Sequence, residues 1–89
     1  MMSEDLKRGQ QIAYVPDHAD GNLGHRDVEF GFVTSVKGDT VFCRYWSRYT
    51  PNELRTKANS EGAHRRFIVP HVSHDPAMVD DAFKEYEIP

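Results

Sequence analysis

The chain has little of what several large classes of protein depend on. Its 89 residues contain one cysteine, Cys43, so no disulfide can form within the chain. No apolar run approaches the roughly 18 residues that a transmembrane helix needs. The first residues, MMSEDLKR, lack the apolar stretch of a secretory signal. We therefore expect a cytoplasmic protein that does not itself bind a membrane.

Motifs for catalysis, metal binding and nucleotide binding are also missing. No glycine pattern suits a phosphate-binding loop, and no serine stands in a nucleophile elbow. His18 lies near Asp20, and His71 and His74 lie near Asp75, but these spacings match no zinc pattern and no cysteine pair supports them. The sequence therefore predicts no cofactor and no metal ion.

Charge is unevenly distributed along a chain whose formal net charge is -3. Residues 44–66 contain six basic and two acidic side chains, whereas residues 71–89 contain five acidic and one basic. Two interpretations fit this asymmetry. The acidic tail packs near the basic middle and neutralises it, or the basic middle is a surface that binds a partner.

Apolar alternation and turn residues predict five short strands. The expected strands are 12–15, 30–36, 41–47, 54–58 and 67–69. Between the first two lies a polar loop, 17–27, with no helical or strand period. The second and third strands flank the tight turn at residues 37–40, where Gly38 permits a positive φ. Residues 60–62 are expected to break the fourth strand.

The end of the chain changes to a helical period. Asp75 suits an N-cap and Pro76 suits the first helical position. One apolar stripe then follows the spacing i, i+3, i+4 and i+7, at Val79, Ala82, Phe83 and Tyr86. Because an isolated helix of about three turns is unstable in water, we expect a helix near 76–86 that packs on the strands or on a partner.

Residues 9–15 (GQQIAYV), followed by 31–33 (GFV), resemble the opening of KOW and Tudor-type members of the SH3-like barrel superfamily. The resemblance covers residues 8–70 and implies a mostly β fold, a five-stranded antiparallel SH3-like barrel with a short C-terminal α-helix. Residues 1–7 would be a flexible N-terminus, and 71–89 a linker and the helix. The stretch 27–61 is also similar to small uncharacterised proteins of bacteria and their phages.

Two departures from the family pattern argue against two functions that occur in these families. The first connection of KOW domains is short, whereas residues 16–29 are a long polar loop, which argues against ribosomal or transcription-factor RNA binding. Tudor readers of methylated lysine build an aromatic cage partly from this loop. Residues 17–27 contain no aromatic side chain, so a methyl-lysine reader is not expected.

The third expected strand carries the candidate binding site. Its alternation assigns Val41, Cys43 and Tyr45 to the core and turns Arg44, Trp46 and Arg48 to the other side. With Arg55 and Lys57 from the next strand, the predicted binding surface is Arg44, Trp46, Arg48, Arg55 and Lys57. The competing interpretation places Trp46 under the C-terminal helix and pairs Arg44 and Arg48 with its acids.

These observations predict a non-catalytic binding module, a small bacterial or phage accessory protein. We expect its partner to be another protein. Exposed Trp and Arg side chains are enriched at protein-binding hot spots. The first alternative is a nucleic-acid-binding regulator, because alternating aromatic and guanidinium groups can stack bases and pair phosphates. The second alternative is a small metal-dependent enzyme.

Overall fold

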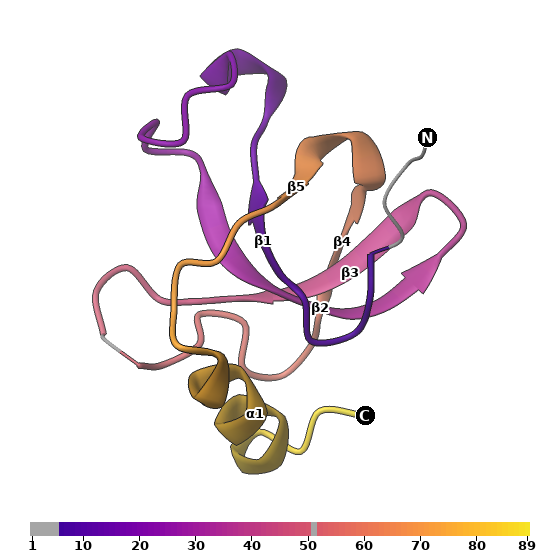
Figure 1. Cartoon of the computed structure of the whole chain (residues 1–89), viewed down its shortest axis with the longest axis vertical. Coiled ribbons are helices and arrows are strands. Elements are labelled where there is room, and N and C mark those ends of the chain that lie inside the picture. Colours follow the sequence, from indigo (N-terminus) through magenta and orange to yellow (C-terminus); the bar gives the residue numbers. More distant parts are fainter. Residues whose placement is uncertain (1–5, 51) are drawn as a thin grey trace.

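A five-stranded antiparallel sheet and one C-terminal helix make up the fold (Figure 1). The computed structural model describes residues 6–50 and 52–89. The sheet has the order β4-β3-β2-β1-β5, so the first strand lies between the second and the fifth. The elements are β1 Gln11–Tyr14, the 3-10 turn η1 Asp17–Ala19, β2 Glu29–Lys37, β3 Thr40–Tyr45, β4 Glu61–His64, the 3-10 turn η2 Arg65–Phe67, β5 Ile68–Pro70 and α1 Pro76–Glu85.

The sheet is open. β4 and β5 are its two edges, and no strand ladder among the described residues joins them. Both edge strands are short, and η2 turns the chain between them, so few backbone groups remain to pair. The mostly β class, the five antiparallel strands and the helix are confirmed, whereas the structure does not show a closed barrel.

The β2–β3 hairpin agrees with the sequence prediction. Lys37 pairs with Thr40 across the turn, and Gly38 has a φ of 59°. The pairing of the two strands shifts between Val33 and Ser35, where β2 carries a bulge. Nearer its start, β2 crosses β3 so closely that a Cβ on Gly31 would lie 2.0 Å from the carbonyl oxygen of Arg44. Only glycine fits at this crossing.

The fourth strand is not where the alternation placed it. In the segment 54–58, Leu54 forms an isolated bridge with Trp46 and no ladder follows. Strand β4 instead begins at Glu61, where a break was expected. Leu54 and Thr56 are buried, so the alternation correctly indicated that these two side chains face the interior. Two backbone hydrogen bonds join the start of this segment to the chain around Trp46. Beyond them, side-chain hydrogen bonds of Arg44 and Thr56 take the place of a strand ladder.

Two apolar clusters lie on opposite faces of the sheet. The first contains Val41, Cys43 and Tyr45, all 3% exposed or less, which confirms the predicted core face of β3. The second forms where α1 covers the other face, and it contains Phe32, Trp46, Leu54, Val79, Ala82 and Ile88. The sheet is thus covered on both sides near its centre.

Helix α1 begins and packs as predicted. The side chain of Asp75 accepts a hydrogen bond from the backbone N–H of Ala77 at 2.9 Å, and Pro76 is the first helical residue. Its buried residues Val79 and Ala82 face Phe32 and Trp46. None of the helices in the described ranges is both long and apolar enough to cross a bilayer.

Candidate binding groove

Two of the five predicted binding residues are in the interior. Arg44 is 4% exposed and Trp46 is 5% exposed, so the prediction that they lie on an open strand face is wrong. The physical reason is that the outer face of β3 is covered by two distant segments, 54–60 and α1. Arg48, Arg55 and Lys57 remain at the surface.

Arg44 organises the segment beside it. Its guanidinium donates to the carbonyl oxygens of Thr56 at 3.2 Å and Lys57 at 2.9 Å, and its Nε donates to Ser60 Oγ at 2.9 Å. Burial lowers the pKa of Arg44. This residue fastens an irregular loop onto the sheet, so we assign it a structural role.

Arg55 and Lys57 form ion pairs with acidic side chains of the same chain. Arg55 lies 2.8 Å from Glu29 and 2.9 Å from Glu61, and the hydrogen bond to Glu61 raises the pKa of Arg55. Lys57 lies 3.1 Å from Glu53. These pairs leave little net charge there for a partner, and the structure does not bring the five predicted residues to one surface.

Trp46 lies beneath the C-terminal helix, as the competing interpretation predicted. The other half of that interpretation is wrong, because neither arginine pairs with an acid of α1. Arg44 bonds to carbonyl oxygens, and Arg48 donates to the carbonyl oxygen of Val28. The acidic tail therefore does not neutralise these arginines by direct ion pairs within the residues that the structure describes.

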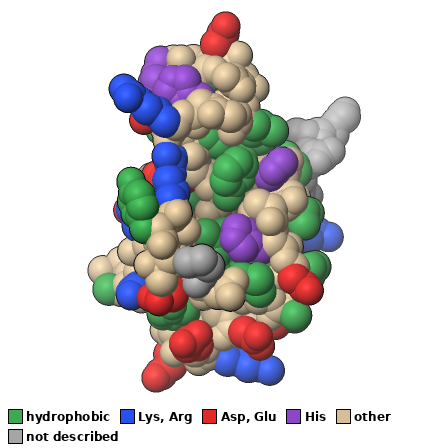
Figure 2. All heavy atoms as spheres, turned by 90° about the vertical axis from the view of Figure 1, so that its left-hand side faces the viewer, with side chains coloured by type: hydrophobic (Ala, Val, Ile, Leu, Met, Phe, Trp, Pro, Cys, Tyr) green, Lys and Arg blue, Asp and Glu red, His purple; other side chains and the backbone are tan. Residues whose placement is uncertain are grey.

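Trp46 is among the residues that line a groove of about 370 Å³. The ring of His74 stacks on Trp46, with centroids 4.6 Å apart and an interplanar angle of 22°. The groove lies between the 17–27 loop, the end of β3 and the linker before α1, and Figure 2 shows this hollowed face with its histidine and hydrophobic side chains. Its apolar and aromatic lining includes Leu23, Phe30, Trp46 and His74, and its cationic rim is Arg26 and Arg48.

Gln11 fixes one wall of the groove. Its side-chain oxygen accepts hydrogen bonds from the backbone N–H groups of Ser73 and His74, and its amide donates to the His74 carbonyl at 2.8 Å. Because Gln11 is itself buried at 6% exposure, it sets the position of His74 over Trp46. Sequence analysis missed this residue, although a glutamine in an apolar strand is a visible signal of a satisfied buried amide.

The buried face of Trp46 leaves one donor unsatisfied. Its Nε1 has no hydrogen-bond partner among the described residues. An unpaired buried donor costs about 1–3 kcal/mol. The cost of this unpaired donor adds to the burial of the indole beneath α1.

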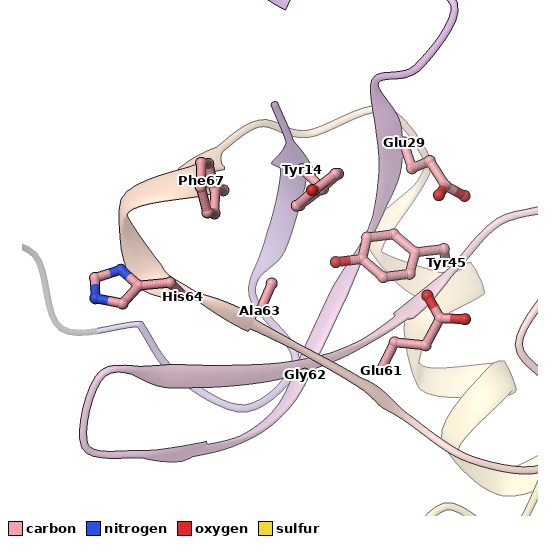
Figure 3. A pocket seen from close by; sticks show the side chains of 8 residues that line it. All are labelled: Tyr14, Glu29, Tyr45, Glu61, Gly62, Ala63, His64 and Phe67. Carbon is pink, nitrogen blue, oxygen red and sulfur yellow. The ribbon is translucent and has the colours of Figure 1, made fainter. Parts of the chain in front are cut away.

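A second cavity, of about 310 Å³, lies in the gap between β1, β3 and β4 (Figure 3). Tyr14, Tyr45 and Phe67 line it, with the Tyr14 ring 6.5 Å from Tyr45 and 6.0 Å from Phe67. An aromatic cage was considered only in the 17–27 loop, so this group was not predicted from the sequence. Its two carboxylates, Glu29 and Glu61, are already paired with Arg55, whose guanidinium lies 5.6 Å from the Tyr45 ring.

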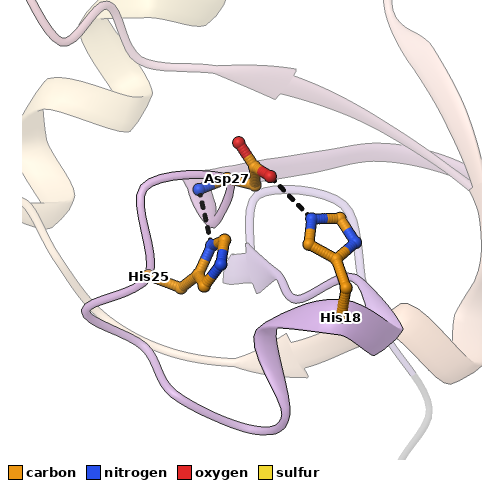
Figure 4. A group of neighbouring side chains, drawn as sticks. All are labelled: His18, His25 and Asp27. Atoms are coloured by element: carbon orange, nitrogen blue, oxygen red, sulfur yellow. Dashed lines mark hydrogen bonds and ion pairs between the residues drawn. The ribbon is translucent and has the colours of Figure 1, made fainter.

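The three histidines singled out by sequence spacing form no ion pairs with the acids at those spacings. His71 lies against Phe30, and His74 against Trp46. The Nε2 atom of His18 lies 2.6 Å from Asp27 Oδ2 (Figure 4). The acid that pairs with His18 is therefore Asp27, whereas the sequence spacing had drawn attention to Asp20. His25 lies next to both, and its Nδ1 accepts from the backbone N–H of Asp27 at 3.0 Å.

The candidate nucleophiles are poorly placed for reaction. Cys43 is fully buried, and this burial raises the pKa of its thiol to about 12, which disfavours the reactive thiolate. Ser73 Oγ lies 2.7 Å from His74 Nδ1, but the ring stacks on Trp46 and no described carboxylate orients it.

Comparison with protein-family models, with curated proteins and with solved structures finds no match for this chain. The functional argument therefore depends on the geometry and chemistry of the groove and of its neighbouring side chains.

Proposed function

We propose that the protein is a non-catalytic binding module whose groove holds a segment of a partner protein. The observation that carries this proposal is a groove lined by apolar and aromatic side chains together with the guanidinium groups of Arg26 and Arg48. Neither Arg26 nor Arg48 forms an ion pair with any described residue. Glu29 also lines the groove, but it pairs with Arg55. A ligand carboxylate would therefore meet two guanidinium groups that no described carboxylate binds directly.

The groove chemistry defines the class of segment. Phe30 and Leu23 offer apolar area to an aliphatic or aromatic side chain, and Leu23 is 39% exposed at the edge. Trp46 adds little area, because it is 5% exposed and His74 stacks on its ring. Arg48 and Arg26 offer planar donors that suit carboxylates. The partner segment is therefore an apolar anchor residue flanked by Asp or Glu. Anchors of this kind in desolvated pockets carry most of the binding energy in protein interfaces.

Nucleic acid is a poorer fit to the same groove. Stacking a base needs an open aromatic face, and His74 already covers the ring of Trp46. Arg44 is buried, and Arg55 and Lys57 are ion-paired, so they do not extend a basic track. The net charge of -3 also gives no general attraction to phosphate.

We also propose that the fold of this chain is related to the SH3-like barrel. β1 pairs with both β2 and β5, so the chain returns to its first strand after a three-strand meander. The gap between β4 and β5 is spanned by η2. This connectivity supports a relationship to barrels in which the same edges come closer together.

Panning of a random peptide library on the whole chain tests the binding proposal. We expect enriched peptides to share an apolar residue next to Asp or Glu. Binding should change the emission of Trp46, the single tryptophan of the chain, because its ring lines the groove. The double variant Arg26→Glu/Arg48→Glu should weaken peptide binding at least about tenfold through loss of charge complementarity.

The matched control is the double variant Lys7→Glu/Lys37→Glu, the same change in charge at two exposed positions that do not line the groove. It should leave peptide affinity within about twofold. Equal loss in the control and the groove variant would mean that only net charge matters and would refute the groove. Selective binding of oligonucleotides, with affinity falling steeply with salt, would favour the alternative function.

A further inference from the structure

We propose that His18, His25 and Asp27 form a binding site for a divalent transition-metal ion such as zinc, on the loop between β1 and β2. One ligand atom from each residue lies within 4.8 Å of the other two (Figure 4). The metal proposal does not depend on the function proposed for the groove, although His25 is common to both, and its test uses the metal alone.

The loop is built to hold these three residues together. Ala19 and Val28, 2% and 3% exposed, anchor its two ends against Ala13 of β1. Between them the chain reverses through Asp20 and Gly21, whose φ values are 54° and 76°. Backbone hydrogen bonds then fix successive turns, from Asn22 to Ala19, from His25 to Asn22 and from Val28 to His25.

The spacing of the ligand atoms is close to that of a metal site. Ligand atoms 2.0–2.2 Å from a tetrahedral zinc ion lie roughly 3.4 Å apart. His18 Nε2 and Asp27 Oδ2 are 2.6 Å apart, so their hydrogen bond would open by less than about 1 Å to admit an ion. A side-chain rotation of His25, which gives up the bond from Asp27 N–H, would direct a ring nitrogen to the same point.

One of the three ligands carries the negative charge that favours a cation. Asp27 supplies a carboxylate, and its Oδ2 lies 2.6 Å from His18 Nε2. An incoming ion takes the place of this hydrogen bond, and any proton on the coordinating ring nitrogen leaves to solvent.

The ligand types select the class of ion. Two imidazole nitrogens and one carboxylate suit zinc, copper, nickel or iron, whereas calcium and magnesium require more oxygen ligands. Three protein ligands leave a fourth position open to water or to a side chain of a partner. Because His25 also lines the groove, a bound ion would fix the loop wall of that groove.

Calorimetric titration of the full chain with ZnCl₂ tests the site, with cobalt absorption as a report on tetrahedral coordination. We expect one saturable site that magnesium does not occupy. Loss of a group that merely orients a ligand costs about 10–100-fold in metal affinity. His18→Ala, His25→Ala and Asp27→Asn should therefore each weaken zinc binding at least tenfold.

His71→Gln is the matched control, since this histidine lies against Phe30 and outside the cluster. It should retain the affinity of the original chain, and circular dichroism should show that every variant is folded. Zinc binding that survives all three cluster variants would overturn the site. So would an affinity weaker than about 0.1 mM in the original chain, or equal loss in the control.

Discussion

Replacement of the buried Arg44 by methionine should destabilise the fold more than any substitution of an exposed arginine. The guanidinium makes two hydrogen bonds of 2.9 Å, to Ser60 Oγ and the Lys57 carbonyl, and a weaker one of 3.2 Å to the Thr56 carbonyl. Bonds from a charged donor contribute about 1.5–3 kcal/mol each. The two short ones together amount to about 3–6 kcal/mol, part of which offsets the cost of burying the charge.

We therefore expect Arg44→Met to lower the free energy of unfolding by about 3 kcal/mol, a large share of the 5–15 kcal/mol typical of a domain. Urea denaturation followed by circular dichroism measures this. With a slope of about 1.5 kcal/mol per molar, the midpoint should fall by about 2 M. Arg44→Lys should give an intermediate loss, because an ammonium group does not reproduce the planar set of donors.

The control is Arg55→Met, the same substitution at an exposed position in the segment that lies beside Arg44. The Arg55 side chain is 41% exposed and its partners are surface carboxylates, so the loss should be within about 1 kcal/mol. If the two methionine variants unfold at the same urea concentration, Arg44 does not fasten the loop, and the argument from its buried hydrogen bonds fails.

Three further outcomes follow from local geometry. Cys43 should react with a thiol reagent only at the rate of unfolding, because burial raises the pKa of its thiol to about 12; fast labelling of the native protein would contradict this. Gly31→Ala should cost about 3 kcal/mol or more in a thermal melt, because its new Cβ would lie 2.0 Å from the Arg44 carbonyl oxygen; an unchanged melting temperature would show that the strands separate freely. Asp75→Ala should cost about 1 kcal/mol through loss of its 2.9 Å cap on Ala77 N–H, whereas Asp75→Asn should restore most of it.

Three parts of the fold follow from short-range rules and were predictable. The hairpin depends on a turn residue that tolerates positive φ, and Gly38 supplies it. Helix α1 depends on its cap, and Asp75 and Pro76 mark its start. The inner face of β3 depends on alternation alone, and Val41 and Cys43 lie in the core accordingly.

The candidate site was predictable only in part. Trp46 and Arg48 do meet at one groove, and their alternation along the chain indicated this much. Gln11, His74 and the rim residue Arg26 were not found, because they come from three other segments. The cluster at His18 was considered with Asp20, yet the turn at Gly21 brings Asp27 to it instead.

Local sequence patterns were enough for the β2–β3 hairpin, for helix α1 and for the core face of β3, because caps, turns and periodicity act over a few residues. They misplaced the fourth strand, and they did not decide what covers the outer face of β3. Segment 54–60 and α1 close over the outer side of β3 and bury Arg44 and Trp46, although alternation assigns both to the face away from the core. Coverage depends on contacts between residues far apart in the chain, and no local pattern records them.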